Sequence, residues 1–406
     1  MIFAWEQCKL GDVAKIVGGG TPSTKKSEYW NGNINWFTPA EIGNQIFVSH
    51  SQKKITELGL LKSSAKILPA GAILFTSRAG IGNTAILTRN ACTNQGFQSI
   101  VPYSNKLDSY FIYSESAKLK RYGETMGSGS TFTEVSGKQM KKMSLHIPNI
   151  NEQAKIGNML KILDQTITLH EEKKRQLERL KSALLKKMFA DKSGYPAVRF
   201  NGFCDEWKKQ KLGDIVETIT DYVAAGSFAS LRENVIYRSE PCYAQLIRTA
   251  DLKSNFSKIA PVYVDKQAFD FLYRVSLDKE SVILPNIGNC GEVYYVDPHE
   301  LPYMRNVLGP NAILIRSSSL NNHFLSILFQ SHNFQKSLKL VISPNGQTKF
   351  NKTELKRIKM VLPMDVNEQN SLSAFFKMIN TAISLQEHKS NILKELKSSL
   401  LQNMFI

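Results

Sequence analysis

Apolar side chains recur at alternating intervals of four and three residues in two long stretches of the chain, residues 151–189 and 367–406. A seven-residue repeat aligns these side chains along one side of a helix, so the pattern predicts two long amphipathic helices. The seams are polar in the middle and apolar toward both ends. Their positions are Ile156, Leu160, Leu163, Ile167, His170, Lys174, Leu177, Lys181, Leu184 and Met188, then Leu372, Phe376, Ile379, Ile383, Gln386, Ser390, Leu393, Lys397, Leu400 and Met404.

The tripeptide Asn-Glu-Gln stands at the start of each predicted helix, at Asn151 and at Asn367. An asparagine can cap a helix, and an acidic residue in the first turn complements the helix dipole. A lone helix of this length would expose a continuous apolar stripe to water, so each helix needs a partner. We expect the two helices to pair with each other, which places their polar seam positions together.

The helices belong to an internal duplication. "LKSALLKKMF" at Leu180–Phe189 and "LKSSLLQNMF" at Leu396–Phe405 share seven of ten residues, and "WEQCKLGD" from Trp5 is repeated as "WKKQKLGD" from Trp207. The ends of the two copies match while their middles diverge, as expected for a common scaffold that presents different binding surfaces. The predicted organisation is a globular segment 1–150, a helix 151–189, a linker 190–206, a second globular segment 207–366 and a helix 367–406. Aromatic residues in the linker indicate that it packs against the protein.

The two globular segments have mixed patterns. Ala72–Thr88 and Ser281–Val296 are typical of two strands joined by a Gly/Asn turn, whereas residues 107–122 and 321–338 have helical periodicity. We therefore predict an α+β fold. The "GGG" at Gly18–Gly20 lacks the Lys-Ser/Thr of a phosphate-binding loop, and we interpret it as a flexible turn.

The chain has 52 basic and 35 acidic residues and a net charge of +17. The surplus is +8 in residues 1–150 and +5 in residues 207–366, so both globular segments favour a polyanionic partner, with nucleic acid ahead of a membrane surface. Five scattered cysteines argue against a disulfide framework or a cysteine-rich zinc site and indicate a cytoplasmic protein. No apolar run approaches the length of a membrane span, and the N-terminus does not resemble a signal peptide.

Several motifs in the same order are similar to those of one family. They are the repeated "W…KLGD", the "IP/LP…NEQ" helix entry, the joint "YPAVRFNGF…W", the two long helices, and the loops "GSGSTF" at Gly127–Phe132 and "NGQTKF" at Asn345–Phe350. With the duplication, they make the chain resemble the specificity subunit of type I restriction–modification systems over essentially its whole length.

This resemblance implies that each globular segment is a target recognition domain for one half of a bipartite, asymmetric DNA sequence. It implies that the helices pack as an antiparallel coiled coil that sets the spacing and docks two methyltransferase subunits, with restriction subunits joining through that core. S-adenosylmethionine, ATP and magnesium would then be bound by the partner subunits and not by this chain. Antiparallel pairing of two copies of one helix also creates a pseudo-twofold repeat, and such symmetry suits two major-groove segments about one turn, ~34 Å, apart.

Base edges are discriminated by hydrogen-bonding side chains on loops, so we selected the Arg, Asn, Gln, Ser, Thr and Lys side chains of predicted turns. Each is as plausible as an ordinary solvated turn residue. Lys25, Lys26, Lys138 and Lys352 are better suited to phosphate contacts. The candidates for DNA binding are Ser77, Arg78, Asn83, Thr84, Asn94, Gln95, Ser128, Ser130 and Thr131, then Asn286, Asn289, Arg305, Asn306, Asn345, Gln347 and Lys349.

Two other classes of protein compete with this interpretation. A self-sufficient DNA methyltransferase or nuclease would need a catalytic motif, and the sequence contains no Asp/Asn-Pro-Pro-Tyr/Phe, no phosphate loop and no His/Cys metal spacing. A coiled-coil adaptor that binds only proteins would leave the charge of both globular segments unexplained. We therefore expect a non-catalytic subunit that recognises DNA.

Overall fold

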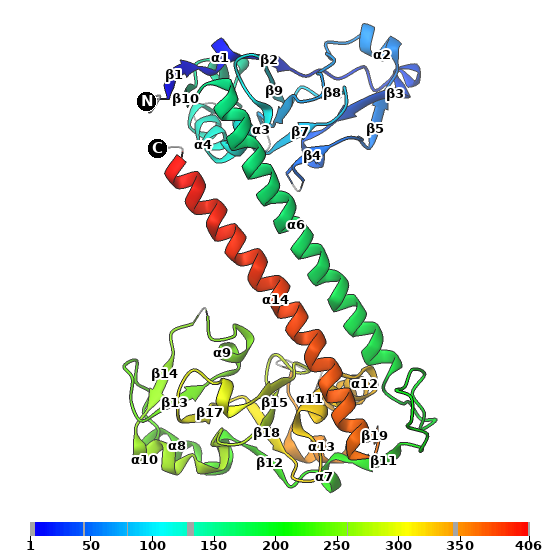
Figure 1. Cartoon of the computed structure of the whole chain (residues 1–406), viewed down its shortest axis with the longest axis vertical. Helices are drawn as coiled ribbons and strands as arrows, with labels where there is room; N and C mark the ends of the chain where they lie inside the picture. Colours follow the sequence, from blue (N-terminus) through cyan, green and yellow to red (C-terminus); the bar gives the residue numbers. More distant parts are fainter. Residues whose placement is uncertain are drawn as a thin grey trace. The chain divides into compact units, whose positions relative to one another are not determined.

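The computed structural model describes residues 5–43, 45–78, 80–127, 134–257, 259–343 and 348–404. The chain divides into two compact units: unit 1 comprises Met1–Glu171 and His388–Ile406, and unit 2 comprises Glu172–Glu387 (Figure 1). The two predicted long helices are confirmed as α6, Ile150–Lys187, and α14, Val366–Met404, and each contributes a part to both units.

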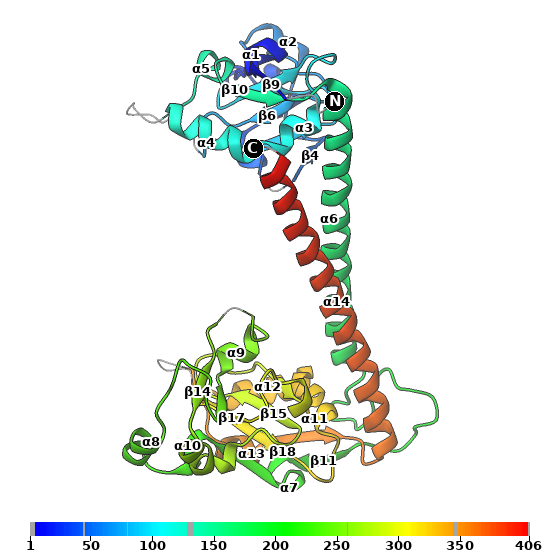
Figure 2. The same cartoon turned by 60° about the vertical axis from the view of Figure 1, so that its left-hand side comes forward.

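Unit 1 contains a five-stranded sheet in the order β2-β9-β6-β7-β4, a three-stranded sheet β5-β3-β8 and a strand pair β1-β10. Most of its strand pairs are antiparallel, and helices α3 and α4 lie against the five-stranded sheet (Figure 2). Its elements are β1 Glu6–Lys9, α1 Leu10–Val13, β2 Ala14–Gly18, β3 Trp30–Phe37, β4 Phe47–Val48, β5 Lys53–Ile55, α2 Glu57–Leu61, β6 Ile73–Phe75, β7 Thr84–Leu87, β8 Cys92–Thr93, β9 Gln98–Pro102, α3 Ser109–Ser114, α4 Ser116–Gly127, α5 Gly137–Lys141 and β10 Ser144–Ile147.

The predicted strand–turn–strand at Ala72–Thr88 is confirmed by the antiparallel pair β6 and β7. Both strands are buried on both faces, because side chains point alternately into two cores. Ile73 and Phe75 join one core with the helical residue Phe111, while Leu74 joins the other. The chain is apolar at successive positions here because the sheet is covered on both sides.

Unit 2 has a four-stranded sheet β12-β18-β15-β16, a three-stranded sheet β14-β13-β17 and a strand pair β11-β19. The predicted strands within Ser281–Val296 are β15 and β16, and the helical prediction for 321–338 is confirmed by α11 and α12. Its elements are β11 Lys208–Lys211, α7 Leu212–Ile215, β12 Thr218–Asp221, α8 Phe228–Asn234, β13 Ala244–Ile247, α9 Thr249–Lys253, β14 Val262–Val264, α10 Lys266–Phe271, β15 Ser281–Pro285, β16 Tyr294–Val296, β17 Asn306–Leu308, β18 Ala312–Arg316, α11 Asn322–Gln330, α12 His332–Val341, α13 Lys352–Arg357 and β19 Lys359–Leu362.

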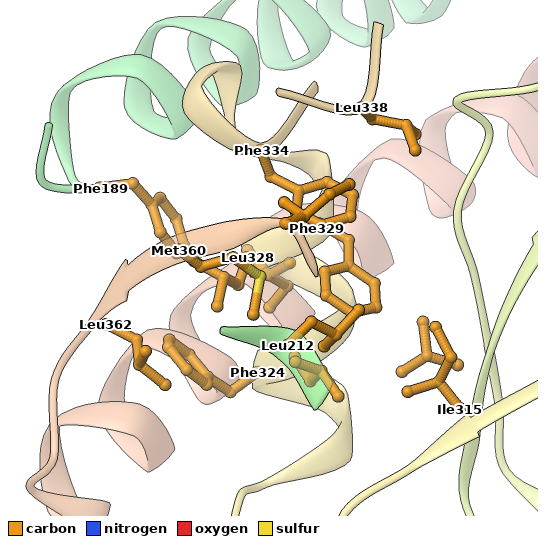
Figure 3. Close-up of a cluster of buried hydrophobic side chains, with 14 of the residues drawn as sticks. Phe189, Leu212, Ile315, Phe324, Leu328, Phe329, Phe334, Leu338, Met360 and Leu362 are labelled. Atoms are coloured by element: carbon orange, nitrogen blue, oxygen red, sulfur yellow. The ribbon is translucent and has the colours of Figure 1, made fainter. Parts of the chain in front are cut away.

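A large apolar cluster joins the sheet of unit 2 to its helices (Figure 3). Phe189, just beyond the end of α6, inserts its ring between Trp207 at 6.0 Å and Phe376 at 6.0 Å. Phe324 of α11 stacks on the same ring at 6.3 Å. The decapeptide that ends each helix thus serves, in its first copy, to anchor α6 in the core.

Both units use the same frame where the long helices begin. Trp5 donates its indole N–H to Glu152 at 3.3 Å, and Trp207 donates to Glu368 at 3.2 Å. The next residue in each Asn-Glu-Gln, Gln153 or Gln369, is buried and donates to a proline carbonyl. An antiparallel strand pair lies just before each helix: β1-β10 before α6 and β11-β19 before α14. The duplication seen in the sequence is therefore a duplication of hydrogen bonds.

The helix caps lie two residues before the predicted ones. Asn149 accepts the backbone N–H of Glu152 at 3.0 Å, and Asp365 accepts that of Asn367 at 2.7 Å. Asn151 and Asn367 already belong to the helices. The prediction that the Asn of Asn-Glu-Gln caps each helix is wrong. The capping side chain lies two residues earlier, on the connection between the preceding strand and the helix.

Within each unit, α6 and α14 run antiparallel. In unit 1, Asp164 pairs with Lys397 at 2.6 Å and Glu171 pairs with Lys394 at 2.6 Å, so position rises on one helix as it falls on the other. In unit 2, Lys174 pairs with Glu387 at 2.8 Å. Of the polar middle positions, Lys174 of the first seam thus forms an ion pair between the two helices.

The linker between the repeats packs against unit 2, as predicted. Trp207 is 2% exposed, and the Arg199 guanidinium binds both carboxylate oxygens of Glu368, at 2.7 and 2.8 Å. The five cysteines are free thiols. Among the residues that the structure describes, no helix combines the length and apolarity of a membrane span, and no group of His, Cys, Asp or Glu side chains is placed to hold a metal ion.

Candidate nucleic-acid interface

In unit 1, the loop between β6 and β7 is shaped by Thr76. Its hydroxyl donates to the carbonyl of Gly80 at 2.7 Å and accepts the backbone N–H of Asn83 at 2.9 Å. Gly80 and Gly82 adopt φ of 100° and 97°, a conformation that side chains rarely tolerate. A single hydroxyl and two glycines therefore shape the loop that carries Arg78, which is half-buried and whose backbone forms a β-bridge with Glu134.

A second loop, residues 93–97, lies directly beside the first. The backbone N–H of Ser77 donates to the carbonyl of Gly96 at 2.8 Å, and a Cβ added at Gly96 would lie 3.6 Å from Arg78 Nε. Asn94 stabilises this loop by accepting the N–H of Gly96 at 2.8 Å. Gln95 accepts a hydrogen bond from the hydroxyl of Thr21.

The glycines at 18–20 pack against the second of these loops and are not the flexible turn expected from the sequence. Gly18 ends β2, and a Cβ added at Gly19 would lie 1.9 Å from the carbonyl oxygen of Asn94. Gly20 donates its N–H to the carbonyl of Thr93 at 2.9 Å. Glycine is required here because two backbones approach each other closely.

The structure brings four of the candidates in unit 1 together. Arg78, Asn83 and Asn94 are half-buried and Gln95 is exposed, all on the two adjacent loops. Ser77 and Thr84 are buried, and Thr84 donates to Ser116 at 3.0 Å. Burial disfavours a direct base contact by these two side chains in this conformation. Three candidates lie outside the described residues: Ser128, Ser130 and Thr131.

In unit 2, the turn after β15 pairs with the segment that follows residue 347. Gly288 donates its N–H to the carbonyl of Thr348 at 2.9 Å, and the Thr348 hydroxyl donates back to the Gly288 carbonyl at 2.7 Å. This pairing gathers three candidates: Asn286 is half-buried, whereas Asn289 and Lys349 are exposed. Candidates 60 residues apart in the sequence thus form one cluster.

A pocket of about 480 Å³ opens beside Asn286. It is lined by Tyr222, Arg232, Tyr237 and Asn311 among others. The Asn286 side chain donates to the carbonyl of Phe350 at 3.4 Å, and its amide oxygen is buried without a donor among the described residues. Burial, with a hydrogen bond to Tyr237, raises the pKa of Tyr222, so its hydroxyl stays neutral at physiological pH. The pocket therefore offers neutral donors and acceptors beside one guanidinium, Arg232, and one carboxylate, Asp221.

Arg305 and Asn306 belong to a different part of unit 2. Arg305 is exposed, with its guanidinium 4.6 Å from the centre of the Tyr243 ring. Asn306 begins β17, is 4% exposed and donates to the carbonyl of Tyr303 at 2.6 Å, which disfavours a direct contact with a base. Two further candidates, Asn345 and Gln347, lie outside the described residues.

The lysines proposed for phosphate contacts differ from one another. Lys25, Lys26 and Lys138 are exposed, as a phosphate contact requires, although Lys26 also lies 3.8 Å from the exposed carboxylate of Glu28. Lys352 instead forms an ion pair with Asp221 at 2.7 Å, so a phosphate would have to displace a carboxylate there. The exposed lysines are compatible with the predicted role.

The description "Type I restriction modification DNA specificity domain" belongs to a family model that matches residues 4–179 and 204–395. These two segments cover most of the chain, and each contains one of the candidate loop clusters. The chain belongs to this family. Its two matches coincide with the two copies found by internal comparison.

Among curated proteins, the type I restriction enzyme MjaIX specificity subunit of Methanocaldococcus jannaschii is 35% identical over 239 residues, which cover 56% of this chain and 54% of that protein. The EcoR124I/EcoR124II specificity subunit of Escherichia coli is 33% identical over 168 residues, covering 39% and 40%. The matches thus span about half the length of these relatives or less. The fold is similar to the crystal structure of a type I restriction–modification S subunit from M. genitalium, with a TM-score of 0.64 and 14% identity over 100% of this chain and 97% of that one.

Sequence inspection missed the residues that surround Asn286. Arg232 and Tyr237 come from α8 and the segment after it, and Asn311 has a positive φ of 69°. The hydrogen bond from the N–H of Asn286 to the carbonyl of Asn311, at 3.1 Å, joins them. A positive φ outside glycine favours asparagine, so the Pro-Asn dipeptide at this position was the one available sequence signal.

Proposed function

We propose that this chain is the DNA-specificity subunit of a type I restriction–modification complex. In this proposal each unit recognises one half of a bipartite, asymmetric site in double-stranded DNA. The observation that carries it is the double match to the specificity-domain family, one match for each unit, in a chain whose two globular segments both carry a positive surplus. Phosphate contacts by exposed lysines would supply affinity, and loop side chains would supply specificity.

Each unit combines a frame that both units share with candidate loops that differ between them, and this supports the assignment. The frame of Trp, Glu and Gln around each helix start is common to both units, whereas the candidate loops are not. In unit 1 the candidates are an arginine and amides on two adjacent loops. In unit 2 they are amides and a lysine beside a pocket, with Arg305 in a different part of the unit. Different donors and acceptors on one frame would select different bases, because each base pair presents its own pattern in the major groove.

The two long helices would form an antiparallel coiled coil that sets the distance between half-sites. At ~1.5 Å per residue, a helix of 38 residues such as α6 is about 57 Å long, more than one turn of DNA. Ion pairs such as Asp164–Lys397 and Lys174–Glu387 would fix the register of this spacer. The pairing of two copies of one helix would give the subunit a pseudo-twofold axis.

The partners follow from the same proposal. Two methyltransferase subunits would dock on the helices, and restriction subunits would join through that core in the cytoplasm. S-adenosylmethionine, ATP and magnesium would be bound by those subunits, and this chain would contribute recognition without catalysis.

Methylation by a reconstituted complex tests the proposal. The chain, purified with a cognate methyltransferase, should direct methylation to one bipartite sequence, and exchange of residues 1–150 for another recognition domain should change only one half of it. Inserting seven residues in each helix should change the gap and preserve both halves. Methylation by the chain alone would make it an enzyme. A complex that binds and methylates DNA without sequence preference would contradict the proposal.

A further inference from the structure

The two units differ at the glutamate that each tryptophan contacts. In unit 2, the Glu368 side chain is 2% exposed and is held by Trp207 and by both donors of the Arg199 fork. In unit 1, Glu152 accepts a hydrogen bond from Trp5 at 3.3 Å and one from Asn149 at 3.5 Å, and no cation pairs with it among the described residues. The same carboxylate therefore has an arginine in one repeat, whereas the described part of the other repeat provides none.

The linker that supplies Arg199 also covers an apolar part of the helices in unit 2. The next residue, Phe200, packs edge-on against Phe375 of α14, with ring centres 5.6 Å apart. Two residues earlier, the N–H of Val198 donates to the carbonyl of Lys187 at 3.0 Å, at the end of α6. Glu368 and Phe375 are seven residues apart and therefore lie on the same face of α14. The adjacent residues Arg199 and Phe200 contact both of them, the arginine through the carboxylate and the phenylalanine through the aromatic ring.

The equivalent groove in unit 1 is open. With the repeat offset of 216 residues, Glu368 corresponds to Glu152, Phe375 to Met159 and Leu184 to Leu400. A shallow groove of about 510 Å³ lies there between α6 and α14, and its lining on α6 begins three residues after Glu152, at Lys155. Met159 is 37% exposed, Ile162 61% and Leu396 47%. The groove is lined by Lys155, Asn158, Met159, Ile162, Leu163, Leu396 and Leu400.

We propose that this groove of unit 1 binds an extended segment of a partner protein that carries adjacent arginine and phenylalanine residues. The arginine binds Glu152 through its two-pronged guanidinium, as Arg199 binds Glu368, and the phenylalanine covers Met159, as Phe200 covers Phe375. Burial of an aromatic side chain on an exposed apolar helix face provides affinity, and the charge pair fixes direction and register. Arg199 and Phe200 of a second copy are already engaged in its own unit 2, which favours a different protein as the source. This inference does not depend on which DNA sequence the chain recognises.

A synthetic peptide with the sequence of residues 190–206, labelled with fluorescein, tests the inference on the full chain. Fluorescence anisotropy should show saturable binding. Glu152→Gln in the protein, or Arg199→Ala in the peptide, should weaken it at least about tenfold, because a charge-assisted pair is lost. Ile162→Asp should weaken it similarly. Its matched control is Met378→Asp at the equivalent position of unit 2, which is 70% exposed and should leave binding unchanged.

A charge exchange makes the test specific. Glu152→Arg should abolish binding of the native peptide and restore binding of the peptide with Arg199→Glu. Lack of binding, or binding that Glu152→Gln does not weaken, would overturn the proposal. Loss of binding in Met378→Asp alone would place the peptide on unit 2. A dimer of the chain that Glu152→Gln dissociates, seen by light scattering, would assign the groove to a second copy instead.

Discussion

Unit 1 and unit 2 begin with the same strand pair, the same tryptophan–glutamate hydrogen bond and the same buried glutamine, yet they differ in what surrounds those groups. Glu368 is buried under an arginine, whereas Glu152 is partly open. Lys397 pairs with a carboxylate, whereas the equivalent Lys181 contacts the amide oxygen of Gln330 at 2.8 Å. A duplicated frame therefore conserves the hydrogen bonds that start each helix, while the charged groups on the helix faces have diverged. Equivalent substitutions in the two units should then have unequal effects.

The largest effects should come from the apolar positions that anchor the helices. Leu160 and Phe376 occupy equivalent places, and both are fully buried. Phe376→Ala should lower the free energy of unfolding by about 3–5 kcal/mol, and Leu160→Ala by about 2–5 kcal/mol, because each leaves a cavity. Hydrogen exchange measured by mass spectrometry should place the faster exchange in unit 2 for Phe376→Ala and in unit 1 for Leu160→Ala.

Met378→Ala is the control for these two substitutions, since that side chain is 70% exposed. Faster exchange in both units for either buried substitution would show that the units unfold as one. In that case a substitution in one unit would lower the stability of both units equally.

Removal of the linker arginine should have the next largest effect. Arg199→Ala leaves the Glu368 carboxylate buried without its cation, which should cost about 3 kcal/mol. Glu152→Gln in unit 1 should cost below about 1 kcal/mol, because that group has no such partner among the described residues. Urea denaturation followed by tryptophan fluorescence measures both. The double variant Arg199→Ala with Glu368→Gln should recover part of the loss, and equal costs for the two single variants would contradict the comparison.

The helix lysines should show a smaller difference. Lys397 binds both oxygens of Asp164, at 2.6 and 2.8 Å, and Tyr110 donates to the same carboxylate at 2.8 Å. Lys397→Ala should cost about 2 kcal/mol, since the buried carboxylate of Asp164 keeps only the tyrosine. Lys181→Ala should cost below about 1 kcal/mol, because burial lowers the pKa of Lys181 and its partner is neutral. Thermal unfolding of the two variants decides the order, and a larger loss for Lys181→Ala would reverse the argument.

The sequence predicts the elements of this fold better than their contacts. The long helices and the strand pairs β6-β7 and β15-β16 depend on periodicity that is visible within a window of residues. The caps at Asn149 and Asp365 were missed because each helix start offers two polar side chains two residues apart, Asn149 or Asn151 and Asp365 or Asn367, and only the backbone path selects one of them. Local pattern determines the type of an element more strongly than its first residue.

The candidate loops were selected by residue type, and their arrangement depends on long-range contacts. Ser77 bonds to Gly96, 19 residues further along the chain, and Gly288 bonds to Thr348, 60 residues further along. Such pairs leave no periodic signal, so the sequence could not show that Ser77 is buried while Arg78 is not. The polar residues near Asn286 were missed for the same reason. Internal comparison of the repeats did locate the Trp, Glu and Gln of each helix start, because both copies of the sequence contain these residues.

The smallest difference should appear under acid conditions and concerns His323, which is 2.8 Å from Ser373 and packs edge-on against Tyr295. Burial, with Lys377 and Lys181 nearby, lowers the pKa of His323 from 6.5 to about 4. Between these values the unfolded chain binds the proton and the folded chain does not, so this group makes stability fall as pH falls from 6.5 toward 4. The neutral imidazole is thus part of the native packing of α11 against α14.

At pH 5, wild-type unit 2 should lose about 1 kcal/mol through this group, a value that allows for solvent screening of a partly exposed site. His323→Gln should remove that part of the pH dependence, while the unfolding of unit 1 should be the same in both proteins. Urea denaturation at pH 7 and pH 5 measures the change in unfolding free energy of each protein, and hydrogen exchange assigns the change to a unit. The titratable groups that both proteins share cancel in the difference between wild type and His323→Gln. An identical pH dependence in His323→Gln would show that folding does not lower the pKa of this imidazole. The lysines beside it would then have to move away as it charges, and the α11–α14 contact would be looser than the one that Tyr110 and Asp164 make in unit 1.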